Sequence, residues 1–162
     1  MTPELLALAE IVLAENRAAG RCVAVAESCT GGLVSAALTE IAGSSDVFDR
    51  GFITYSNAAK QEMLGVSEDV IATFGAVSVA TAWAMAQGAL ANSTADVAVA
   101  ITGIAGPGGA TKGKPVGMVV FARAVRGQDP EQVVADTRQF GDLGRAAVRR
   151  QAALVALELL RP

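Results

Sequence analysis

The chain has 162 residues, of which 52% are hydrophobic but only 4% aromatic, so a single domain must build its core mainly from Ala, Val, Leu and Ile. The net charge is −3, whereas nucleic-acid binding usually needs an excess of basic residues, so we expect no nucleic-acid partner. The chain contains no histidine, which excludes Ser-His-Asp and Cys-His catalysis and any zinc centre with imidazole ligands.

The first twenty residues are apolar at helical spacing but carry acidic side chains such as Glu4 and Glu10, and they lack the features of a signal peptide. No uncharged apolar run is long enough to span a membrane, so we expect a cytoplasmic protein with no membrane partner. Cys22 and Cys29 lie seven residues apart, which is neither a metal-site spacing nor a disulfide framework. We therefore expect reduced thiols. Separately, we expect neither a metal nor a cofactor.

Apolar periodicity and turn residues predict the elements in chain order. Helices are expected over residues 3–19, 30–43, 57–64, 67–73, 75–90 and 144–160, with Asn57 as the cap of the third and Ser78 as the cap of the fifth. Strands are expected over residues 21–26, 46–55, 97–102, 118–125 and 132–140, and residues 103–117 hold too many glycines and prolines for a regular element. This order predicts an α/β fold, a three-layer αβα sandwich with a mixed sheet of about five strands, as one domain over residues 1–162.

Polar residues follow three of the predicted strands at the point where each ends. These exits are residues 27–32, 54–60 and 102–109. Ligands of such sheets bind outside the carboxyl ends of the strands, at a switch in strand order. We therefore expect the three exits to compete for, or share, one site. The glycines of the third exit resemble a phosphate cradle but match neither the P-loop nor the dinucleotide fingerprint.

The first exit belongs to the stretch AVAESCTGG at residues 24–32, which joins a predicted strand to a predicted helix. Ser28 is the candidate nucleophile. The backbone N–H groups of Thr30, Gly31 and Gly32 are the candidate oxyanion hole, because N–H groups at a helix start have no partner within the helix. The alternative interpretation is an ordinary Ser/Thr cap followed by glycines that allow close packing.

Without histidine, the base must be another residue. Lys60 is the candidate, because an ammonium in a dry pocket can lose its proton near neutral pH, and Tyr55 could relay that proton or orient the lysine. The alternatives are a solvated lysine on a helix and a tyrosine that only packs. Cys29 is a weaker rival to Ser28, because no neighbouring residue in the sequence would lower its pKa.

Several long motifs occur together in register: AESCTGGLVSAALTEIAGSS, the segment from residue 51 to GVS at 65–67, GAVS at 75–78, ITGIAGPGG and KPVG at 114–117. In these the chain resembles the CinA carboxy-terminal domain family over residues 5–160. The resemblance implies an αβα fold, frequent homo-oligomers such as dimers, and hydrolysis of the carboxamide of nicotinamide mononucleotide to nicotinate mononucleotide and ammonia. It implies no metal, with Ser28, Tyr55 and Lys60 as the catalytic residues. The substrate-binding residues that it implies are Thr30, Gly31, Gly32, Ser45, Thr102, Gly103, Gly106, Gly108 and Arg145.

Two departures from the family pattern limit what the resemblance implies. Larger members carry an amino-terminal domain similar to molybdopterin-binding proteins, which these residues do not contain, so we expect no second activity. The family's Gly-Asp-Arg motif is spread here over residues 141–145, which leaves Arg145 as a candidate phosphate ligand and gives Asp142 no role. A nucleotide-binding or regulatory module without turnover, and a related amide or phosphate ester as substrate, stay open as alternatives.

Overall fold

One mixed sheet runs through the computed structural model, which describes residues 1–162. Its strand order is β2-β1-β3-β4-β5, in which β1 pairs in parallel with β2 and β3, while β4 is antiparallel to β3 and β5. The strands are β1 (Val23–Glu27), β2 (Phe48–Ile53), β3 (Val97–Gly103), β4 (Met118–Val125) and β5 (Val134–Gln139). The predicted mixed sheet of about five strands is confirmed.

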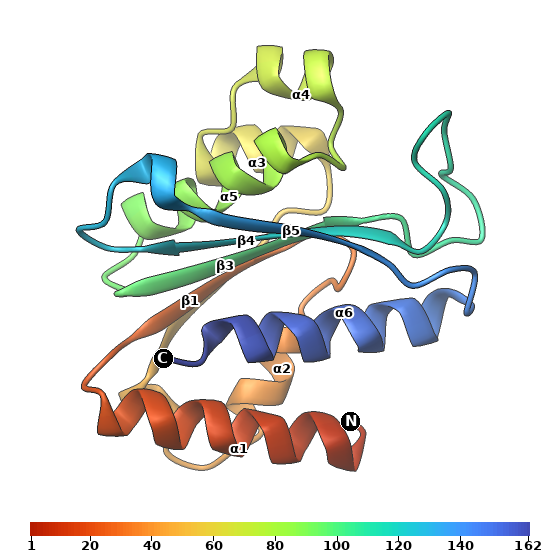
Figure 1. Ribbon diagram of the computed structural model, residues 1–162. Coiled ribbons are helices and arrows are strands. Elements are labelled where there is room, and N and C mark those ends of the chain that lie inside the picture. Colours follow the sequence, from red (N-terminus) through yellow and green to blue (C-terminus); the bar gives the residue numbers. More distant parts are fainter.

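Helices cover both faces of the sheet (Figure 1). On one face lie α1 (Pro3–Ala18), α2 (Leu33–Thr39) and α6 (Arg145–Leu160), and on the other α3 (Asn57–Leu64), α4 (Glu68–Phe74) and α5 (Val79–Ala91). Short 3-10 turns, η1 (Ser44–Asp46) and η2 (Pro130–Gln132), precede β2 and β5. No helix is long and apolar enough to cross a membrane.

Two predicted helix starts were wrong. α2 begins at Leu33 rather than at residue 30, because Gly31 and Gly32 adopt positive φ angles of 58° and 94°, which a right-handed helix cannot contain. The cap of α3 is Ser56, whose hydroxyl accepts a hydrogen bond from the backbone N–H of Ala59, and Asn57 is instead the first helical residue. The side chain of Asn57 is therefore not needed to cap the helix.

The two faces of the central strands differ in side-chain size. Valine and alanine alternate along β1 and β3, and since successive side chains in a strand point to opposite faces, all the valines face α1, α2 and α6. The alanines face α5, which also contributes small residues such as Ala82 and Ala86. Gly88 of α5 lies against the end of α3, where a Cβ would overlap the carbonyl of Leu64. This close packing fixes α3 beside the carboxyl end of β2.

The segments that follow the neighbouring strands β1 and β2 lie on opposite faces of the sheet. The chain leaves β1 into α2 on one face, and it leaves β2 into α3 on the other (Figure 1). Such a switch opens a crevice at the carboxyl ends of the strands. The topology therefore places residues that follow β1, β2 and β3 around one opening.

Candidate active site

A cavity of about 190 Å³ lies at the carboxyl ends of β1 and β3. Its walls come from the turn after β1, the start of α3, the end of β3, the segment before α5 and the start of α6. The lining residues with polar side chains are Ser28, Cys29, Tyr55, Asn57, Lys60, Thr102 and Arg145. All three strand exits predicted from the sequence therefore contribute to one site.

Ser28 and Lys60 are hydrogen bonded inside this cavity. The Nζ of Lys60 lies 3.1 Å from the Oγ of Ser28 and donates to the backbone carbonyl of Thr54 at 2.9 Å. The side chains come from opposite sides of the crevice, since Ser28 directly follows β1 and Lys60 lies on α3. The structure thus joins two residues that are 32 positions apart in the sequence.

Lys60 is buried without a counter-ion. It is 1% exposed, and no acidic side chain forms an ion pair with it. Desolvation by burial lowers the pKa of Lys60 from 10.5, because an apolar surrounding disfavours the charged ammonium, and only the thiol of Cys29 opposes this shift. A lowered pKa makes the neutral amine, which can accept a proton from a serine hydroxyl, easier to form.

Glu27 fixes the turn that carries Ser28. This fully buried carboxylate closes β1 and accepts four hydrogen bonds: from the N–H groups of Gly32, Val34 and Ser35, and from the hydroxyl of Ser35. A carboxylate in this position satisfies the unpaired N–H groups at the start of α2. Glu27 therefore takes the place of a ligand that would otherwise bind this helix end.

These contacts overturn part of the predicted oxyanion hole. The N–H of Gly32 donates to Glu27, and the N–H of Gly31 donates to the carbonyl of Ser28 at 3.0 Å. Of the three predicted donors, only the N–H of Thr30 forms no hydrogen bond within the chain. Gly31 and Gly32 therefore serve the conformation of the turn, and the prediction that their N–H groups face a ligand was wrong.

Arg149 of α6 holds the same turn from the other side. Its guanidinium donates to the carbonyl of Cys29 at 3.2 Å and to that of Thr30 at 2.7 Å. Sequence reasoning missed both Glu27 and Arg149 as positioning residues. The lone charge at the end of an apolar strand was a signal for Glu27, but only the docking of α6 onto the turn reveals Arg149.

Tyr55 and Arg145 meet at the mouth of the cavity. Arg145 donates to the hydroxyl of Tyr55 at 2.7 Å and to the carbonyl of Gly106 at 3.0 Å. Tyr55 is 59% exposed and forms no hydrogen bond with Lys60 or Ser28. The predicted proton relay through Tyr55 therefore has no direct path in this geometry.

Of the remaining predicted binding residues, some line the cavity and others lie outside it. Thr102 and Gly103 line the cavity, and the hydroxyl of Thr102 donates to the carbonyl of Ala76 at 2.8 Å. Gly108 is exposed in the loop after β3 and does not line the cavity. Ser45 lies in η1, just before β2 begins and so at the opposite end of the strands. The structure therefore does not bring Ser45 to the site.

Cys29 lines the cavity but is not activated. Burial raises the pKa of its thiol to about 12, with the nearby carboxylate of Glu27 as a smaller contribution, so the thiol stays protonated at neutral pH. A thiol is a much weaker nucleophile than a thiolate. This favours Ser28 over its neighbour, as the sequence predicted.

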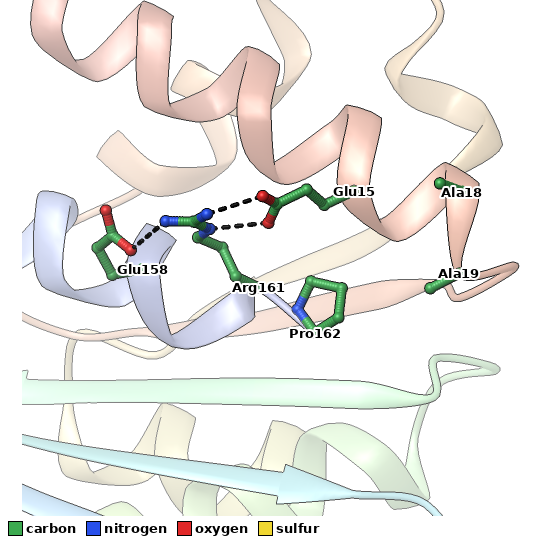
Figure 2. Close-up of a pocket in the computed structure, with 6 residues that line it drawn as sticks. All are labelled: Glu15, Ala18, Ala19, Glu158, Arg161 and Pro162. Carbon is green, nitrogen blue, oxygen red and sulfur yellow. Dashed lines mark hydrogen bonds and ion pairs between the residues drawn. The ribbon is translucent and has the colours of Figure 1, made fainter.

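A larger hollow, of about 680 Å³, lies at the other end of α6 (Figure 2). There the guanidinium of Arg161 forms ion pairs with Glu15 of α1 at 2.7 Å and with Glu158 at 3.0 Å. α6 has 16 residues, which puts its two ends about 24 Å apart. The hollow contains no serine, cysteine or lysine, and its cation is already paired, so we place the chemistry in the smaller cavity.

Fold and site together define a three-layer αβα protein with a serine and a buried lysine paired at a strand switch. A model of the CinA C-terminal domain matches residues 5–162, and the chain belongs to this family. The nicotinamide-nucleotide amidohydrolase PncC of Enterobacter agglomerans is 53% identical over 142 residues, which are 88% of this chain and 84% of that protein. PncC of Escherichia coli (strain K12) is 51% identical over 158 residues, 97% of this chain and 93% of that protein.

The fold agrees with that of a solved relative. The crystal structure of the competence/damage inducible protein CihA from Agrobacterium tumefaciens superposes with a TM-score of 0.94 at 49% sequence identity. The match covers 99% of this chain and 95% of that chain. The resemblance seen in the sequence is thus confirmed for both family and fold.

Proposed function

We propose that the protein is a nicotinamide-nucleotide amidohydrolase that converts nicotinamide mononucleotide to nicotinate mononucleotide and ammonia by a serine-lysine mechanism. The observation that carries the mechanism is the 3.1 Å contact between Lys60 Nζ and Ser28 Oγ, with Lys60 buried and unpaired. The names of relatives that are 51% and 53% identical over most of their lengths support the substrate.

The first half of the reaction transfers the acyl group to the enzyme. The neutral amine of Lys60 takes the proton of the Ser28 hydroxyl as Oγ attacks the carboxamide carbon and the carbonyl becomes an oxyanion. When this tetrahedral intermediate collapses, the C–N bond breaks and Lys60 returns the proton to the leaving nitrogen. Ammonia departs, and the nicotinoyl group remains esterified to Ser28.

The second half releases the acid. Water attacks the ester carbon while Lys60 accepts a proton from it, and the second intermediate collapses with Ser28 Oγ as the leaving group. Lys60 then protonates Oγ, so the free enzyme is restored. Throughout the cycle the contact with the carbonyl of Thr54 keeps Nζ beside Oγ.

The size of the cavity suggests how the nucleotide binds. Its 190 Å³ is below the range of about 300–1,000 Å³ typical of pockets that enclose a whole drug-sized ligand. We therefore place the carboxamide-bearing ring inside, with the ribose phosphate leaving through the mouth. Arg145 lies at that mouth and is the phosphate ligand we propose, since a guanidinium suits the geometry of a phosphate.

The test is ammonia release from nicotinamide mononucleotide by the purified protein, beside its Ser28→Ala variant. We expect release by the parent and a loss of at least about 1,000-fold in kcat for the variant. An active Ser28→Ala protein would contradict the mechanism. A parent that is stabilised by the nucleotide but releases no ammonia would favour the alternative, a binding module without turnover.

A further inference from the structure

The proposed reaction needs hydrogen-bond donors for the carbonyl oxygen, and the glycine turn cannot supply them as predicted. The N–H groups of Gly31 and Gly32 are used within the turn, and the hydroxyl of Thr102 already donates to Ala76. Lys60 becomes an ammonium as the oxyanion forms, but its N–H groups are directed to Oγ of Ser28, to the leaving nitrogen and to the carbonyl of Thr54. Of the predicted donors only the N–H of Thr30 is left, and we look for a further donor beside it that faces Ser28.

We propose that Asn57 is a further catalytic residue, whose side-chain amide donates a hydrogen bond to the oxygen of the scissile carboxamide. Asn57 lines the cavity with Ser28 and lies on α3 one turn before Lys60. Its amide forms no hydrogen bond within the chain, whereas the side chains of Tyr55, Lys60, Thr102 and Arg145 all do. Two neutral side chains in the cavity therefore keep a free donor, the amide of Asn57 and the hydroxyl of Tyr55, and the Tyr55 hydroxyl is held at the mouth by Arg145.

The position of Asn57 supports a role in chemistry rather than in folding. Ser56 caps α3, so the Asn57 side chain has no structural task at the helix start, and it is exposed. The backbone N–H of Cys29, which also donates to no carbonyl or carboxylate, directly follows the nucleophile. In the nucleophile elbow of α/β-hydrolases an N–H in that position is one of the oxyanion donors. One backbone and one side-chain donor would together form the oxyanion hole.

The inference rests on the proposed function, and it predicts a specific kinetic signature. A donor that binds the oxyanion better than the ground-state carbonyl raises kcat without changing KM much. Asn57→Ala and Asn57→Asp should therefore lower kcat by about 100- to 1,000-fold, the range found on removing one oxyanion donor, with KM within about threefold of the parent. Both variants should keep the melting temperature of the parent, since no internal contact is lost.

The matched control is Gln61→Ala, which removes another amide of α3 that does not line the cavity. It should keep parental kcat and KM. The second readout is the rate at which a fluorophosphonate modifies Ser28, because the phosphonyl oxygen occupies the oxyanion hole whatever the natural substrate is. Both Asn57 variants should be modified at least about tenfold more slowly than the parent and the control.

The two readouts separate the inference from the proposed substrate. If the parent releases no ammonia but is modified at Ser28, the substrate is wrong, and slow modification of the Asn57 variants still supports the inference. Modification of these variants at the parental rate would overturn the inference. If the parent releases ammonia, Asn57 variants with the parental kcat would also overturn it. A parent that is not modified at all would overturn both the serine mechanism and the role of Asn57.

Discussion

The cavities near the two ends of α6 contain cations in opposite settings. Near its start Lys60 is 1% exposed, has no acidic partner and hydrogen bonds only to Ser28 and a backbone carbonyl. At its end Arg161 is 38% exposed and is paired with two carboxylates (Figure 2). The smaller cavity therefore contains a buried, unpaired ammonium, and the larger hollow contains an exposed guanidinium that is paired with carboxylates.

The two arrangements have different electrostatic consequences. A buried, unpaired ammonium is unfavourable, so the surrounding fold has to maintain it, and its pKa falls. An exposed ion pair is screened by water and contributes little, and the guanidinium simply holds the pKa of Glu15 below 4.5. Size alone would have pointed to the wrong end of the molecule.

The largest expected effect on kcat comes from replacing Lys60. Lys60→Met should lower kcat at least about 1,000-fold because the base is lost, yet raise the melting temperature at neutral pH because a desolvated ammonium is removed. The measurements are ammonia release and thermal unfolding. The gain in stability should shrink as pH rises from the lowered pKa of Lys60 toward 10.5, since the unfolded chain then binds the extra proton and the parent becomes more stable. A less stable Lys60→Met protein at pH 7 would contradict this view of Lys60.

The next effect is in the pH profile of the parent. Because only the neutral amine accepts a proton, kcat/KM should rise about tenfold per pH unit on the acid side of the Lys60 pKa and level off below pH 10.5. Steady-state kinetics between about pH 6 and pH 10, above the carboxylate range, provide the check. A flat profile over this range would argue against a lysine base.

A smaller effect is expected when the buried carboxylate of Glu27 is replaced, and a still smaller one when the exposed carboxylate of Glu15 is replaced. Glu27→Gln should lower the free energy of unfolding by about 2–4 kcal/mol, because an amide NH₂ would then face buried N–H and hydroxyl donors. It should also lower kcat, since the Ser28 turn loses an anchor. Glu15→Gln is the matched control, and its melting temperature should stay within about 2 °C of the parent. If Glu27→Gln and Glu15→Gln lowered the free energy of unfolding in urea equally, the contrast between the buried and the exposed carboxylate would be wrong.

The smallest effect is expected at the paired cation. Arg161→Ala should leave kcat and KM at their parental values and change the melting temperature by no more than about 2 °C. Any difference should fade below the pKa of Glu15, where that carboxylate is protonated, and also in high salt. A marked loss of ammonia release would show that the two ends of α6 are coupled.

The sequence by itself determined most of the elements and the mixed sheet, and it predicted that Ser28 and Lys60 share one site, where we propose them as nucleophile and base. Alternation, turn residues and the absence of histidine are local or compositional, so they can be read without knowing how the elements pack. The family also followed from motifs in register, and the match of residues 5–162 to the CinA C-terminal domain confirmed it.

Only the tertiary structure decided which donors stay free in the cavity. Hydrogen-bond partners depend on segments far apart in sequence, such as Arg149 on the carbonyl of Thr30 and Arg145 on the hydroxyl of Tyr55. Glu27 accepts from the N–H of Gly32 and the carbonyl of Ser28 accepts from that of Gly31, which are two of the three donors that the sequence offered to an oxyanion. The capping of α3 by Ser56 leaves the side chain of Asn57 free. Each buried donor and acceptor has few possible partners, and the fold alone assigns them.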